Sequence, residues 1–177
     1  TVERLGGIDI LVNNAGIAIR KPPQDYTSDE WDKVLGINLK GTFLCARAVY
    51  PYMVEAGGGS IINIGSMTSI FGSDWVSSYS ASKGGVVQLT RSLAVAWAKD
   101  QIRVNAILPG WIKTDLTSAY WMESDNKERL DFINRRIPFK RWGVPSDLAG
   151  LAVFLSSTAA SYVTGAAIPV DGGYSSF

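Results

Sequence analysis

The sequence contains no histidine and a single cysteine, Cys45. Without histidine these residues cannot form a Ser-His-Asp or Cys-His nucleophilic site, and they cannot ligate haem or catalytic zinc through imidazole. One cysteine excludes an intramolecular disulfide and a cysteine-based zinc cluster, and we expect it to be a buried structural thiol. Proton transfer must therefore rely on Tyr, Lys, Asp, Glu or Ser, and no metal site is predicted.

Charge of either sign is sparse, with 17 basic and 16 acidic side chains scattered along 177 residues. No clustered basic face suggests nucleic acid or an anionic membrane as a partner. The chain also lacks a run of about eighteen apolar residues and a basic-then-apolar leader, so we expect a soluble cytoplasmic protein. An apolar content of 46% is enough for one globular domain with a buried core.

Four short apolar runs rich in branched side chains are typical of strands buried in a parallel sheet. They are residues 8–12, 60–64, 102–108 and 166–170. Helical apolar periodicity lies between them, over residues 28–53, 78–98 and 145–155. No internal repeat or linker divides the chain. The alternation predicts one α/β domain over residues 1–177, with a doubly wound, Rossmann-like parallel sheet.

Two helical features carry more specific expectations. Ser28, followed by two acidic residues, is expected to cap the first helix. The polar segment 117–136 carries widely spaced apolar residues, which favours a mobile helical insertion over a site. A simple pair of solvated helices explains the same segment equally well, and both interpretations stay open.

A hydroxyl, a phenol and an ammonium occur within the stretch from residue 66 to residue 83. Tyr79 and Lys83 are four residues apart, so they stack on one face of a helix. Ser66 falls just beyond the end of the strand 60–64, where ligands of open α/β sheets bind. A lone serine there is usually a turn residue, but its place ahead of Tyr79 and Lys83 outlines an acid-base site.

Small and amide residues mark two further positions. Asn13-Asn14-Ala15-Gly16 ends the first strand in residues that let a ligand approach the backbone, although a plain turn explains them too. Asn38 lies mid-helix, where asparagine is a poor helix former that seeks a specific hydrogen bond. By itself Asn38 is more often a packing feature than a site residue.

In order and spacing, these motifs together resemble the short-chain dehydrogenase/reductase family over all 177 residues. The motifs are Asn13-Asn14-Ala15-Gly16, Asn38, Ser66, Tyr79 with Lys83, Pro109-Gly110 with Thr114, and Val170-Asp171-Gly172-Gly173. One departure is large. That family opens with a strand and a glycine-rich turn that seats the cofactor pyrophosphate, and no such turn precedes Ile8. If that part were truly absent, the first strand would expose its backbone at a sheet edge. We expect instead that these residues are the C-terminal two-thirds of the domain, a fragment or the ordered part of a longer chain.

The resemblance implies hydride transfer involving NAD or NADP, coupled to proton transfer by Tyr79. Lys83 is implied to lower the pKa of the Tyr79 phenol and to hydrogen-bond the nicotinamide ribose. Ser66 is implied to hold the substrate oxygen, and Asn38 to keep a water near Lys83 for proton relay.

The resemblance also implies cofactor contacts. By the resemblance, three residues of the first loop would contact the adenosine half of the cofactor, and Ile37 would pack nearby. Four residues after the third strand would surround the nicotinamide. Besides Ile37, Tyr79 and Lys83, these residues are Asn13, Ala15, Gly16, Pro109, Gly110, Ile112 and Thr114.

The substrate is suggested by the strings Gly65–Ser69 and Ile137–Leu148, which look similar to the sugar-acid members of the family. Those members are of the gluconate 5-dehydrogenase and 2-deoxy-gluconate 3-dehydrogenase type. Arg20 and Lys21 could attract a carboxylate, although surface basic pairs are usually only solvated. We therefore expect a secondary alcohol or ketone of a sugar acid or polyol as the small-molecule substrate.

Two alternatives stay open. One is a 3-oxoacyl-thioester or other carbonyl reductase of the same family. The other is a truncated, cofactor-free oligomerisation module, which the missing glycine-rich turn favours and the intact set of polar site residues disfavours. The helices around Phe43 and Leu93 carry more apolar surface than one sheet face can cover, and the family resemblance implies a homotetramer.

Overall fold

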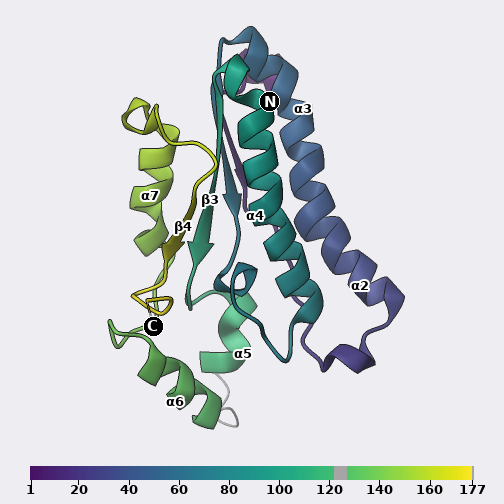
Figure 1. Cartoon of the computed structure of the whole chain (residues 1–177), viewed down its shortest axis with the longest axis vertical. Helices are drawn as coiled ribbons and strands as arrows, with labels where there is room; N and C mark the ends of the chain where they lie inside the picture. The colour runs from purple at the N-terminus through teal and green to yellow at the C-terminus, as the bar shows by residue number, and fades with distance from the viewer. Residues whose placement is uncertain (122–126, 177) are drawn as a thin grey trace.

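The computed structural model describes residues 1–121 and 127–176 and contains one four-stranded parallel sheet (Figure 1). Its strands follow each other in chain order, and their bounds are β1 Ile10–Asn13, β2 Gly59–Ile64, β3 Ile102–Pro109 and β4 Ala167–Val170. All three strand pairs are parallel, so helical segments must return the chain across the sheet each time. The predicted α/β class is confirmed.

Helices separate the strands and cover both faces of the sheet (Figure 1). The α-helices are α1 Val2–Leu5, α2 Ser28–Leu35, α3 Gly41–Glu55, α4 Ser77–Trp97, α5 Ser118–Trp121, α6 Lys127–Arg136 and α7 Ser146–Ser156. A π-helical segment, η2 Gly36–Lys40, joins α2 to α3. Short 3-10 turns are η1 Pro23–Asp25, η3 Met67–Ser69, η4 Ala98–Asp100, η5 Asp115–Thr117 and η7 Thr158–Ala160.

The central strands β2 and β3 are buried on both faces, which explains why they are apolar runs without alternation. Ile61 packs with Met53 and Leu93 in a core beneath α3 and α4. Its neighbour Ile62 packs with Leu155 in a second core beneath α7. Because successive side chains of a strand point to opposite faces, one short run supplies both cores.

Strand β1 begins two residues later than predicted and lies at an edge of the sheet. It includes Asn13, whose side-chain amide donates to Asn63 Oδ1 on β2 at 2.8 Å. The side chains of Ile10 and Val12 stay about half exposed, at 46% and 49%. An amide pair between neighbouring strands therefore extends pairing past the apolar run.

The predicted helix over 28–53 is divided, and its cap is one residue earlier than expected. Thr27, not Ser28, accepts from Glu30 N at 3.2 Å, while Glu30 Oε2 accepts from Thr27 N at 2.9 Å. This reciprocal capping box gives a hydrogen-bond acceptor to the backbone N–H groups of both Thr27 and Glu30. At η2 the N–H of Gly41 bonds to the Gly36 carbonyl, which widens the turn around buried Asn38.

One expectation about a single residue is changed by the structure. Cys45 is exposed on α3, so the expected buried thiol is wrong. In segment 117–136, Ile133 of α6 is only 2% exposed and packs among buried apolar residues. The predicted mobility of this segment is not tested, and residues 122–126 lie outside the described residues. No helix of the described chain is long and apolar enough to span a membrane.

Gly110, which turns the chain out of β3, offers a test of this packing. A Cβ there would lie 2.6 Å from the Asp171 Cα, a backbone atom that cannot move aside cheaply. We expect Gly110→Ala to lower the free energy of unfolding by about 1–3 kcal/mol. Denaturant unfolding of the full-length protein would measure it. Gly150→Ala is the matched control, because nothing lies within 4 Å of that exposed helical position and alanine should add roughly 0.5–1 kcal/mol.

Candidate active site

Lys83 of α4 is the most deeply buried charge near the carboxyl ends of the strands. Its residue exposure is 3%, and its Nζ donates to the backbone carbonyl of Ile64 at the end of β2 at 2.7 Å. Burial disfavours the ammonium form and lowers the pKa of Lys83 to about 8. The Nζ lies 5.7 Å from the ring centre of Tyr79, which confirms that the two side chains share one helix face.

Ser66 and Tyr79 meet beside this lysine. Ser66 follows β2, and its Oγ accepts from Thr68 N and Thr68 Oγ1, both at 3.1 Å. Burial raises the pKa of the Tyr79 phenol, while hydrogen bonding by Ser66 and the charge of Arg20 act in the opposite direction. The net shift is upward. The expectation that Lys83 lowers this pKa is therefore wrong here: burial dominates, and the cation that opposes it is Arg20.

Asn38 has its side-chain amide fully engaged in binding two other segments. Its Oδ1 accepts from Ile17 N at 2.9 Å, and its Nδ2 donates to Ile17 O at 2.9 Å and to Ser82 Oγ at 3.0 Å. The amide thus fastens the loop after β1 to α4, which supports the packing interpretation of a mid-helix asparagine. Its predicted water-relay role is not tested.

The backbone at Gly16 lies close to the side chains of Asn38 and Lys83. A Cβ at Gly16 would lie 3.4 Å from both Asn38 Oδ1 and Lys83 Nζ. Such a Cβ would be in van der Waals contact with the lysine, so a residue without a side chain keeps the space above the lysine open. The predicted use of this loop for close approach of a ligand to the backbone fits that geometry.

A cavity of about 730 Å³ opens above these groups at the carboxyl ends of the strands. It brings together eight of the residues predicted from the sequence, namely Gly16, Ser66, Tyr79, Lys83, Pro109, Gly110, Ile112 and Thr114. The other four, Asn13, Ala15, Ile37 and Asn38, lie outside its lining. Asn13 is turned toward Asn63, as described above, and Ala15 and Ile37 are exposed. Their predicted contacts with the adenosine half of a cofactor are not tested.

The cavity wall also contains residues that the sequence did not single out. Aromatic side chains from three segments take part, including Phe71, Tyr120 and Tyr174. Helix α6 contributes Arg129 and Arg136, which are seven residues apart and therefore lie on one face, two turns from each other. That spacing is the only local signal that could have revealed them.

Positive charge predominates in this wall. The lining holds three arginines, Arg20, Arg129 and Arg136, and one acidic residue, Asp74, which pairs with Arg129 at 3.4 Å. Of the basic pair noted in the sequence, only Arg20 faces the cavity, where it donates to the Leu116 carbonyl. Lys21 instead pairs with Glu30 at 2.6 Å. Within residues 1–121 and 127–176, no group of three His, Cys, Asp or Glu residues is placed to hold a metal ion.

The chain is similar to known proteins in sequence and in fold. A family model described as enoyl-(acyl carrier protein) reductase matches residues 1–175. The 2-dehydro-3-deoxy-D-gluconate 5-dehydrogenase of Escherichia coli K12 is 45% identical over 174 residues, which cover 98% of this chain and 68% of that protein. The chain belongs to the short-chain dehydrogenase/reductase family. Membership confirms the predicted enzyme class, a NAD(P)-dependent oxidoreductase.

Two further comparisons bear on the substrate and the cofactor. A 3-oxoacyl-[acyl-carrier-protein] reductase of Thermotoga maritima is 41% identical, and the match covers 97% of this chain and 68% of that protein. The crystal structure of a gluconate 5-dehydrogenase from Burkholderia cenocepacia, in complex with NADP and tartrate, superimposes with a TM-score of 0.94 at 39% identity. That match covers 99% of this chain and 68% of the other. The chain thus spans about two thirds of the length of these short-chain dehydrogenases/reductases.

The buried ammonium of Lys83 makes stability depend on pH. Its pKa is about 8 in the fold against 10.5 in the unfolded chain, so between these values the unfolded state binds more protons and stability rises with pH. We expect full-length wild-type protein to gain about 3 kcal/mol relative to Lys83→Met across this window. Denaturant unfolding at several pH values would measure the difference.

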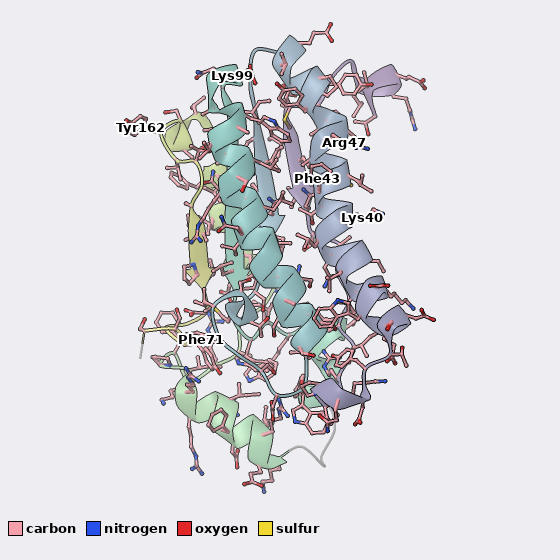
Figure 2. The ribbon with its side chains drawn as sticks, turned by 45° about the vertical axis from the view of Figure 1, so that its right-hand side comes forward. Lys40, Phe43, Arg47, Phe71, Lys99 and Tyr162 are labelled. Carbon is pink, nitrogen blue, oxygen red and sulfur yellow. The ribbon has the colours of Figure 1, made fainter. Side chains whose placement is uncertain are left out.

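The control for this experiment is Lys40→Met, which removes an exposed lysine that points away from the sheet on the far side of η2 and α3 (Figure 2). It should keep the wild-type slope. Equal slopes for wild type and Lys83→Met would show that the ammonium is not buried as described.

Proposed function

We propose that the full-length protein interconverts a secondary alcohol and a ketone on a sugar acid, with NAD or NADP as the hydride carrier. The convergence of Ser66, Tyr79 and Lys83 at one end of a positively charged cavity is the observation that carries this proposal. The name of the Escherichia coli relative and the gluconate 5-dehydrogenase structure, which holds NADP and tartrate, support the same substrate class.

Each side chain has a role in this proposal that follows from its surroundings. Burial keeps the Tyr79 phenol protonated, so it can donate a proton to the oxygen of a ketone, and the phenolate takes the proton back in the oxidative direction. Ser66 holds that same oxygen by a hydrogen bond. The positive charge of Arg20, which lowers the pKa of the phenol against the effect of burial, stabilises the phenolate when it forms.

The cofactor fits the residues that are present. Gly16 leaves room over Lys83 Nζ, and Pro109, Gly110, Ile112 and Thr114 form one wall of the same cavity. When bound, the nicotinamide would supply or accept the hydride. Lys83 and Tyr79 would hold its ribose, the residues after β3 would frame its ring, and Asn13, Ala15 and Ile37 would lie toward its adenosine half.

Arg20 supports an anionic substrate. Its guanidinium lies in the cavity wall 5.3 Å from the ring centre of Tyr120, and its charge acts on Tyr79. A cavity with more cations than acids raises the local concentration of carboxylates. The sequence paired Arg20 with Lys21 in this role, and only Arg20 is suitably placed.

A second candidate is reduction of a 3-oxoacyl thioester. It is favoured by the apolar side chains of the cavity, among them Phe71, Trp111 and Phe132, and by the Thermotoga maritima relative. The thioester competes with a sugar acid for the same proton donor, so a substrate screen separates the two.

Helices α5 and α6 contribute Tyr120, Phe132 and Ile133 to the cavity wall. We propose that the segment 117–136 covers bound substrate as a mobile insertion, which would exclude water from the proton transfer.

The chemistry is tested by titrating full-length protein with NADH and NADPH while following nicotinamide fluorescence, then screening sugar acids, polyols and 3-oxoacyl thioesters. We expect Tyr79→Phe to bind the reduced cofactor normally but to lower kcat by roughly 10²- to 10⁴-fold, because it loses the proton donor. Tyr162→Phe is the control, since that tyrosine is fully exposed far from the cavity (Figure 2).

Near-normal turnover by Tyr79→Phe would show that another group supplies the proton. Failure of the wild-type protein to bind either nucleotide would favour the remaining alternative, a cofactor-free oligomerisation module.

We also propose a homotetramer, in the cytoplasm, without nucleic acid or membrane as a partner. Apolar side chains of the long helices are exposed: Phe43 and Leu44 on α3 at 38% and Val95 on α4 at 82%. Phe43 lies on the outer face of α3 (Figure 2). Burying such a face between subunits is favourable.

Sedimentation velocity of the full-length protein should show a tetramer at micromolar concentration, and Val95→Asp should shift it toward smaller species. A wild-type monomer would contradict the proposal.

A further inference from the structure

Arg136 contacts two aromatic rings at the cavity wall, whereas Arg129 of the same helix contacts one, that of Tyr120 at 5.5 Å. The guanidinium carbon of Arg136 lies 4.5 Å from the ring centre of Tyr174 and 5.3 Å from that of Phe71. These two rings are 6.3 Å apart and inclined at 72°, so they form a corner against which the guanidinium rests. Three segments far apart in sequence meet there: the last turn of α6, the loop after η3, and the C-terminal tail.

The corner fixes the guanidinium without using its hydrogen bonds. A cation beside an aromatic ring is attracted by the ring itself, so these two contacts use none of the guanidinium N–H donors. Across residues 1–121 and 127–176, Arg136 forms no ion pair and its side chain donates no hydrogen bond. A half-buried cation with unsatisfied donors in a cavity wall is ready for an acceptor from a ligand.

The other two arginines of the wall already have acceptors. Arg129 pairs with the carboxylate of Asp74, and Arg20 donates to the Leu116 carbonyl. Arg20 also acts on the Tyr79 phenol through its charge, which places it toward the proton-transfer end. Arg136 is therefore the arginine best suited to a direct contact with the anionic end of a substrate.

We infer, on the basis of the proposed function, that Arg136 binds the carboxylate of the sugar acid and so selects acids over neutral polyols. A guanidinium matches a carboxylate with two parallel N–H···O bonds, which fixes direction as well as charge. With the carboxylate anchored at Arg136, the sugar chain would extend along the cavity toward Ser66 and Tyr79.

The test compares two substrates that differ only at the group in question. D-gluconate and D-glucitol share a six-carbon chain of hydroxyl groups, but gluconate ends in a carboxylate where glucitol has a hydroxymethyl group. Full-length wild-type protein should prefer gluconate. Arg136→Met should lower kcat/KM for gluconate by about 10- to 100-fold, as expected for losing hydrogen bonds to a charged group, and change that for glucitol by less than about threefold.

Two variants separate carboxylate binding from support of the fold. Arg136→Lys keeps the charge and the aliphatic stem but not the planar fork, so it should lose an intermediate amount on gluconate and nothing on glucitol. Arg135→Met removes an exposed arginine in the same last turn of α6 that does not line the cavity, and it should leave both substrates unchanged.

Three results would overturn the inference. Equal losses on gluconate and glucitol in Arg136→Met would mean that Arg136 only holds α6 in place. Unchanged gluconate turnover in that variant would mean that it contacts no carboxylate. Loss of selectivity in Arg20→Met with none in Arg136→Met would assign the carboxylate to Arg20. If the wild-type protein oxidises neither substrate, the proposed function fails, and the inference fails with it.

Discussion

The hydrogen bond from Lys83 Nζ to the Ile64 carbonyl is the contact on which the arrangement of the site depends. An ammonium that is only 3% exposed must find an acceptor, and the last carbonyl of β2 supplies one. This bond fixes the first turns of α4 against the carboxyl end of the sheet. Tyr79, one turn earlier on the same face, is thereby aimed at Ser66, which lies two residues beyond the end of that strand.

A second polar network keeps the first loop within reach of that lysine. The widened turn at η2 directs the Asn38 amide inward, where it bonds to both backbone groups of Ile17 and to Ser82 on α4. Ser82 in turn donates to the Tyr79 carbonyl at 2.7 Å. Because a buried amide with a missing partner is costly, this network specifies one position for the loop, and Gly16 then lies directly over Lys83.

Much of the fold and the chemical end of the site could be predicted from local patterns. Tyr79 and Lys83 share a helix face because they are four residues apart, and Ser66 is located by the apolar strand before it. Features that depend on tertiary packing could not be predicted from such local patterns. The π-helical turn at η2 and the upward pKa shift of Tyr79 are examples, since burial by distant segments determines them.

The same distinction explains why the sequence indicates the reaction more clearly than the substrate. The groups that move the proton come from the loop after β2 and from α4, where short spacings in the chain set their geometry. The aromatic corner at Arg136 joins residues 71, 136 and 174, whose separations follow no helical or strand period. Substrate selectivity can therefore change through one side chain in α6 or the tail while Ser66, Tyr79 and Lys83 keep their positions. A family that applies one chemistry to many substrates requires such independence.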